Sequence, residues 1–203
     1  IDLSHEDQKL NVFFEEENTI EATTNKLNLS GLSRILTRNE ELFDLSGQVD
    51  MHALVRLQEP YPLIRADVKI TDLAYRDMKV ELIRADLGNS SDDLLSLEMF
   101  LRQGVNEIKM KGSYHFSDSL SPMDLKASIE LHDPSGFETI SGGELRDLSG
   151  NISGQLNIMG QVNAPVVEGY ISFQETRFFT KSLNESYSIK DESLIIRDQS
   201  LYF

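Results

Sequence analysis

The sequence predicts an all-β protein, an elongated and curved open sheet with an apolar groove and at most one or two short helices. About eight segments of strand length alternate apolar with polar residues, so each would have one apolar face. Helical spacing is rare, and a strand pattern recurs further along the chain. A closed barrel or a two-sheet sandwich would also cover apolar faces. The recurrence favours the open sheet, because a repeat lets a sheet extend along one axis.

The clearest predicted element is a hairpin within Leu148–Phe173. Its first half alternates with Met159 as the only exception, and the break at Asn163–Pro165 is expected to end the first strand, since proline removes a hydrogen-bond donor. Glycines in the apolar phase indicate a bend or a close approach to the backbone. The apolar phase contains Ile152, Gly154, Leu156, Ile158, Gly160 and Val162 before the break and Val167, Gly169, Ile171 and Phe173 after it.

The other elements are predicted in chain order from the same alternation. A one-residue slip of phase within 19–29 indicates a bulge. Apolar residues at helical spacing predict a short helix within Ser30–Asp44. Leu87–Asp93 is polar and is predicted as a loop, and Asp133–Asp147 as a turn-rich connection. Strands are expected at 9–14, 19–29, within 45–75, from 78, and at 94–101, 108–116 and 125–131.

The internal repeat has a period of about 103 residues. Leu45–Gly47 precedes the identical Leu148–Gly150 by 103 positions (148 − 45), and Pro62 precedes Pro165 by the same distance. The apolar phase is retained between these points. We therefore expect one continuous domain over 1–203, with a first copy at about 20–116 and an incomplete second copy at about 123–203.

Composition and motifs argue against several classes of function. The net charge is −15, so the clustered cations that nucleic acids require are not expected. The chain has no cysteine, its four histidines are scattered, and it contains no HExxH, nucleophile-elbow, P-loop or dinucleotide-binding motif. We expect a protein that is not an enzyme and that uses no metal or cofactor. The missing initial methionine is expected to reflect a piece of a longer protein.

The hairpin sequence LSGNISGQLNIMGQVNAPVVEGYISF resembles the repeats of the TamB proteins, which are components of the translocation and assembly module and relatives of the AsmA-like proteins. The resemblance is strongest over Leu125–Phe178 and weaker over Leu27–Tyr75, where Met51, Leu57 and Ala66 replace three of the glycines. The residues that carry it are Gly47, Pro62, Gly150, Gly154, Gly160, Pro165 and Gly169. It implies a β-taco, a half-pipe of sheet that spans the periplasm from an inner-membrane anchor outside this chain. It also implies phospholipid transport or outer-membrane protein assembly, with an outer-membrane barrel protein as partner.

Phospholipid is the ligand that the apolar phase favours. Burying a methylene gains about 0.8 kcal/mol, so an acyl chain would be strongly retained in an apolar groove. The rival interpretations are a scaffold whose sheet edges pair with client strands, which would also allow edge-to-edge dimers, and a structural module with a packed core. The residues expected to line the groove are Val49, Val55, Ile64, Val68, Ile70, Ile108, Met110, Leu125, Ile129, Leu131, Ile152, Leu156, Ile158, Val162, Val167, Ile171 and Phe173.

Overall fold

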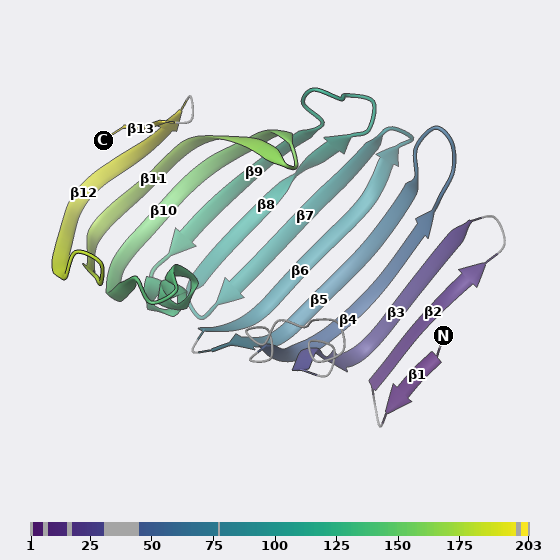
Figure 1. The fold of residues 1–203 in the computed structure, drawn as a ribbon, viewed down its shortest axis with the longest axis horizontal. Helices are drawn as coiled ribbons and strands as arrows, with labels where there is room; N and C mark the ends of the chain where they lie inside the picture. Colours follow the sequence, from purple (N-terminus) through teal and green to yellow (C-terminus); the bar gives the residue numbers. More distant parts are fainter. Residues whose placement is uncertain are drawn as a thin grey trace.

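The computed structural model is one curved antiparallel sheet of 13 strands in which every strand pairs with its neighbours in sequence (Figure 1). It describes residues 2–5, 8–15, 18–30, 45–76, 78–197 and 200–202. The first and last strands lie at opposite ends of the sheet, so the sheet is open. The predicted fold class, all-β with an open sheet and very little helix, is confirmed.

The longest strands are β10 and β11, which each span 17 residues. Successive strands are joined mostly by short turns, which explains the sequential order. The strands are β1 Asp2–His5, β2 Gln8–Glu15, β3 Thr19–Asn28, β4 Leu45–Arg56, β5 Leu63–Tyr75, β6 Met78–Ser91, β7 Leu94–Gln103, β8 Asn106–His115, β9 Met123–Leu131, β10 Leu145–Gln161, β11 Ala164–Thr180, β12 Glu185–Arg197 and β13 Ser200–Tyr202.

The predicted hairpin is present as β10 and β11, but its turn lies elsewhere than expected. The ladder continues to the pair Gln161 and Ala164, so the turn consists of Val162 and Asn163 alone. Pro165 therefore lies inside β11, opposite Gly160, instead of ending the preceding strand. A proline near the start of a strand removes only one donor, which the ladder tolerates.

Two other local predictions can be compared with the structure. The slip within 19–29 is confirmed, because the β3–β4 register shifts between Thr24 and Leu27. The loop predicted at Leu87–Asp93 is wrong, since β6 continues to Ser91 and pairs with β7. Polar side chains on β6 are accommodated there because the ladder uses backbone groups alone. Of the helix predicted within Ser30–Asp44, residues 31–44 lie outside the described residues.

One end of the sheet is organised by the 3-10 helix η2, Pro134–Ser141, which contacts β6 and β10. The Asp133 side chain caps its first turn, and the Glu138 carboxylate accepts a 2.7 Å hydrogen bond from the Leu148 amide. Asn106, at the start of β8, is only 2 % exposed. Its carboxamide donates to the Asp133 carbonyl at 2.6 Å and accepts from the His132 and Asp133 amides. These bonds connect the β7–β8 turn to the entrance of η2.

Burial is concentrated near this end of the sheet. The buried apolar side chains among the described residues are Val49, Val80, Leu131 and Leu148. Most other apolar side chains of the strands are half-buried. This distribution is typical of a single layer, in which neighbouring side chains cover one another but no second sheet is packed on top.

Candidate functional site: the two faces of the sheet

One face of the sheet is apolar across nearly its whole width, and we call it the apolar face. Residues that are directly opposite in adjacent strands point to the same side, so the register identifies its members. Side by side they form rows that run perpendicular to the strands. Three rows are Val49–Ile70–Ile83–Leu101–Ile108–Ile129–Gly154–Ile171–Leu194, Met51–Val68–Ala85–Met99–Met110–Ala127–Leu156–Gly169–Ile196, and Ala22–Ala53–Ala66–Leu87–Leu97–Gly112–Leu125–Ile158–Val167.

The structure brings together all but one of the residues predicted to line the groove. Val55 and Ile64 are opposite each other at one margin of the apolar face, and Leu131, Ile152 and Phe173 form a short row at the other. The exception, Val162, lies in the β10–β11 turn and is 70 % exposed. Val162 was predicted to line the groove because it continues the apolar alternation of β10, but that strand ends at Gln161.

Sequence reasoning missed the part of this face that β6 and β7 contribute. Ile83, Leu87, Leu97, Met99 and Leu101 belong to the three rows. In β7 the apolar residues occupy both phases, so the alternation that identified the other strands is obscured. One signal could have found the β6 residues. Every second residue from 83 to 87 is apolar, and the first two of them lie opposite Ile70 and Val68 of β5.

The glycines on the apolar face mark close approaches between neighbouring strands. A Cβ atom on Gly169 would lie 2.0 Å from the Gln155 carbonyl oxygen, and one on Gly154 would lie 2.6 Å from the Tyr170 carbonyl oxygen. Of the two alternatives that the sequence left open, a bend or a close approach, these two glycines show a close approach by the backbone of the adjacent strand, whereas the nearest atom to a Cβ on Gly160 would be an ordinary 3.5 Å away. Glycine is needed here because the strands pack more closely than a side chain allows.

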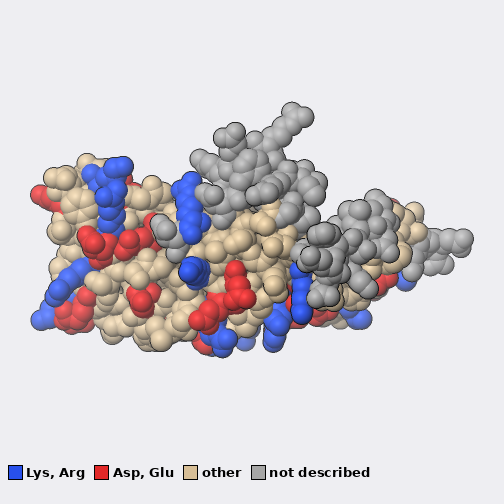
Figure 2. Space-filling view, turned by 90° about the horizontal axis from the view of Figure 1, so that it is seen from below, with Lys and Arg blue, Asp and Glu red and all other residues tan. Residues whose placement is uncertain are grey.

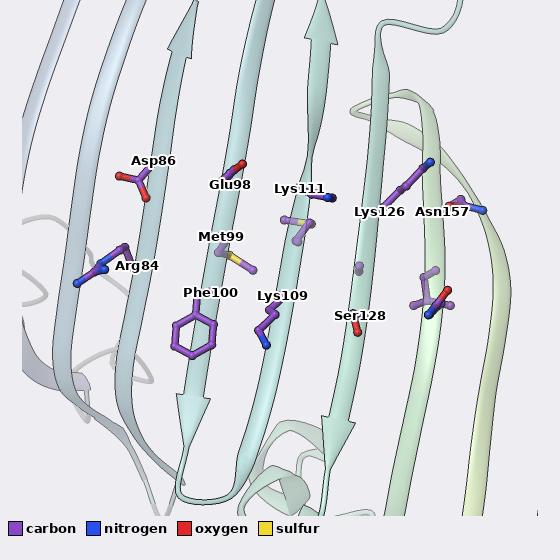
Figure 3. Close-up of a pocket in the computed structure, with 14 residues that line it drawn as sticks. Arg84, Asp86, Glu98, Met99, Phe100, Lys109, Lys111, Lys126, Ser128 and Asn157 are labelled. Carbon is purple, nitrogen blue, oxygen red and sulfur yellow. The ribbon is translucent and has the colours of Figure 1, made fainter.

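Three hollows of the structure lie on the opposite side, which we call the charged face. A hollow of about 680 Å³ lies over β6–β10 (Figure 3). Its walls are two neighbouring rows of mainly polar side chains, and between them the strand segments at Met110, Ala127 and Leu156, whose side chains belong to the apolar face, form the floor. The sequence placed a groove on the apolar face, and its apolar side chains are mostly half-buried, whereas this hollow is lined mainly by polar side chains. The hollow arises because long and short side chains alternate along these two rows of the charged face.

Acidic and basic side chains alternate in patches on the charged face. Asp67, Asp86 and Glu98 are aligned across β5, β6 and β7. Partial burial raises the pKa of the Asp86 carboxyl, and the hydrogen bond and negative charge of Asp67 raise it further. On β4, His52 Nε2 lies 2.8 Å from Glu21 Oε1. Figure 2 shows acidic and basic side chains interspersed along the edge of the sheet seen there.

The side chains of the two faces determine which kinds of ligand each face can bind. Among the described residues, no group of three or more His, Asp or Glu side chains is placed to hold a metal ion. None of the described helices has the length and apolarity needed to cross a membrane. The apolar face offers non-directional contact over a large area, and the charged face offers hydrogen-bonding groups around a shallow hollow.

Comparison with known proteins gave no family model, no curated protein and no solved structure that matches this chain.

Proposed function

We propose that the apolar face carries the acyl chains of phospholipids, as one segment of a route between the inner and outer membranes. The observation that supports this most directly is the continuity of the apolar rows, which begin at β3 or β4 and extend to β11 or β12. The members of these rows are mostly half-buried, so each still exposes apolar surface to contact a ligand. Exposed apolar surface of this extent is characteristic of an interaction site.

The energetics favour a long hydrocarbon as the ligand. Burying a methylene gains about 0.8 kcal/mol, so a sixteen-carbon chain in water is disfavoured by roughly 12 kcal/mol relative to an apolar environment. The rows contain aliphatic and thioether groups, with no charged residue interrupting them between β4 and β10. Contacts of this kind have no preferred direction, so a chain can move from one row to the next. The head group would stay at the open surface in water.

The resemblance of Leu148–Phe173 to TamB repeats supports the same proposal. It leads us to propose a periplasmic location, an inner-membrane anchor in the parent protein, an outer-membrane barrel protein as partner, and a role that is not enzymatic. The acidic composition, with a net charge of −15, would keep such an open sheet soluble.

Photo-crosslinking at adjacent residues of β10 tests the proposal. Ile158 lies on the apolar face and Asn157 on the charged face, one residue away in the same strand. A photoreactive amino acid at each position, followed by irradiation of the chain with phospholipid vesicles and mass spectrometry, should give lipid adducts at Ile158 and few at Asn157. Equal adducts at both positions, or none at Ile158, would contradict the proposal.

A second function, a scaffold that pairs with client strands, is favoured by the exposed edge of β12. Among the described strands, β13 pairs only with Ile195–Arg197 of β12. The outer edge of Glu185–Leu194 therefore has no strand partner within the described part of the chain. Such an edge can accept a strand through backbone hydrogen bonds.

Charge substitutions on the apolar face separate the two functions. Ile108→Glu places a carboxylate in the middle of one row while leaving the β12 edge unchanged. If the face binds lipid, the variant should lose lipid adducts at Ile158. If the edge of β12 is the functional site, the variant should retain the binding of unfolded outer-membrane proteins in a pull-down, provided that circular dichroism shows an intact sheet.

A further inference from the structure

The charged face contains a group of hydrogen-bond donors that the lipid proposal does not use. Six side chains from β8, β9 and β10 lie in two adjacent rows on this face, and we call them the donor patch. Each has at least one N–H or O–H group, and none is a carboxylate. The two rows are Lys109–Ser128–Gln155 and Lys111–Lys126–Asn157.

Two lysines of the donor patch are placed unfavourably for stability. Lys111 and Lys126 are directly opposite in adjacent antiparallel strands. Like charges in this arrangement repel each other. Glu98 is the partner of Lys111 on the other side, yet the two form no ion pair, and Figure 3 shows the Lys111 side chain pointing away from Glu98 toward β9. The Lys126 side chain extends toward β10, so the two ammonium groups are directed to successive strands of the same side of the hollow.

The donors of the patch are also available to a ligand. The hydrogen bonds and ion pairs formed within the described residues include none made by the side chains of Lys111, Lys126, Ser128, Gln155 or Asn157. Lys109 is the exception, because its Nζ lies 2.7 Å from Glu107 Oε2 and 5.8 Å from the centre of the Phe100 ring. These contacts hold Lys109 at one wall of the hollow.

The hollow described above gives the donor patch a defined shape. All six side chains line its space of about 680 Å³, together with Phe100 and, at the far side, Asp86 and Glu98 (Figure 3). Over β6 and β7 lie two carboxylates, Asp86 and Glu98, and one guanidinium, Arg84, whereas the donors lie over β8, β9 and β10. An anionic group is therefore directed to the β8–β10 side, and the hydroxyl groups of the same molecule would meet the carboxylates.

We propose that the donor patch binds the phosphate group of a small, soluble phosphomonoester. A phosphomonoester carries about −1.5 to −2 charges at neutral pH and three strong acceptor oxygens, which matches two opposed ammonium groups flanked by hydroxyl and amide donors. A lipid on the apolar face cannot supply this phosphate, because the sheet itself separates the two faces. The site is therefore independent of the proposed lipid function.

Binding can be measured by titrating the ¹⁵N-labelled chain with inorganic phosphate and with glycerol 3-phosphate at constant ionic strength. We expect saturable shifts of the amide signals of residues 109–111, 126–128 and 155–157. The double variant Lys111→Gln/Lys126→Gln should weaken binding by about tenfold or more, since it removes two charge-assisted contacts. Its melting temperature should not fall, because the repulsion is also removed. The charge-matched control Lys69→Gln/Lys79→Gln should bind as the natural chain does.

Three results would overturn the proposal. The first is the absence of saturable shifts with either probe. The second is an equal loss of affinity in the control variant, which would indicate non-specific attraction. The third concerns the source of the phosphate: if vesicles containing phosphatidic acid shift these signals and the soluble probes do not, the ligand is a lipid surface. Vesicles of phosphatidylcholine alone serve as the blank for that arm.

Discussion

Hairpins β4–β5 and β10–β11 have the same strand register although their sequences share few residues. Val49 faces Ile70 as Ile152 faces Phe173, and Val55 faces Ile64 as Ile158 faces Val167, each 103 positions later. Both hairpins also have a register shift at the glycine of their LSG triplet. The comparison teaches that the register is retained where the alternation and this glycine are retained.

The equivalence ends at the neighbouring strands. Ile20 of β3 faces Val55, whereas Leu125 of β9 faces Ile158, an offset of 105 residues (125 − 20). On the other side, Ile83 of β6 faces Ile70 and Glu192 of β12 faces Phe173, an offset of 109 (192 − 83). Differences in turn length therefore accumulate outside the hairpin, and on β12 they place Glu192 at the position that Ile83 holds on β6.

The hairpins differ most at their turns. Residues 57–62 form a six-residue loop after the pair Arg56 and Leu63, whereas the equivalent segment of β10–β11 adds two more ladder pairs before a two-residue turn. Pro60 and Pro62 have no N–H group to extend the first ladder. The Asn89 carboxamide compensates by accepting from the Ile64 amide at 2.6 Å and donating to the Pro62 carbonyl.

The largest expected effect tests the shared glycine. Gly150 has φ +94°, and an added Cβ would lie 2.5 Å from the Glu175 carbonyl oxygen, whereas the closest contact at Gly47 would be 3.0 Å. We expect Gly150→Ala to lower the free energy of unfolding by about 3 kcal/mol or more, and Gly47→Ala by about 1–2 kcal/mol. Urea denaturation measures both. Equal losses would show that backbone strain, which both positions share, outweighs the difference in space.

A smaller effect is expected from the threonines beside the two bulges. Thr176 of β11 is 0 % exposed and its hydroxyl donates to the Asn151 carbonyl at 3.0 Å. In the first hairpin the corresponding hydrogen bond comes from the strand before the hairpin. There the Thr24 hydroxyl of β3 donates to the Val49 carbonyl at 3.0 Å. We expect Thr176→Val to cost about 1–2 kcal/mol and the less buried Thr24→Val about 0.5–1 kcal/mol.

The control for these threonine variants is Thr180→Val, whose longer 3.4 Å hydrogen bond to the Glu185 carbonyl should contribute little. Urea denaturation curves of the three variants give the order of their losses in the free energy of unfolding. A cost for Thr24→Val that matches or exceeds that for Thr176→Val would mean that burial does not set the strength of the bulge contact.

Much of the fold could be predicted from the sequence because alternation survives in most strands. The faces of β4, β5, β8, β9, β10 and β11 follow from it, as does the bulge in β3. The ends of the strands could be predicted less well from the sequence. Polar residues up to Ser91 stay in the ladder of β6, and Pro165 lies within β11, because backbone pairing with a neighbour outweighs local turn preferences.

The donor patch could not be predicted, since it depends on register between strands. Lys109 and Lys111 on β8 and Lys126 on β9 each look like ordinary solvent-facing residues in their own strands. Only the pairing of Lys111 with Lys126 places the charges together and next to Asn157. A single sequence determines which face a residue is on, and the turn lengths then determine its neighbours.

The smallest expected effect concerns the charged face beside the first hairpin. Asp67 of β5 faces Asp86, whereas the equivalent residue of β11 is Tyr170, so only the first hairpin brings two carboxyl groups together. Burial, followed by the hydrogen bond and charge of Asp67, raises the pKa of Asp86 in the folded protein. A raised pKa favours the protonated form on folding. Its contribution to stability is therefore present at pH values below the ordinary carboxyl pKa and is lost as the pH rises through the raised value.

Asp86→Asn cannot ionise, so it should be slightly more stable than the natural chain at neutral pH, and the difference should disappear as the solution is acidified below the ordinary carboxyl range. The gain should be small because Asp86 is exposed and its charge is screened by water. Thermal melting between pH 3 and pH 7, with Asp124→Asn on β9 as a control for loss of one charge from the same face, measures it. A difference in melting temperature that is constant with pH, or identical in the two variants, would show that net charge and not the Asp67–Asp86 pair is responsible. The second hairpin has no equivalent of this pair, because Tyr170 of β11 stands at the position of Asp67 and faces Ile195.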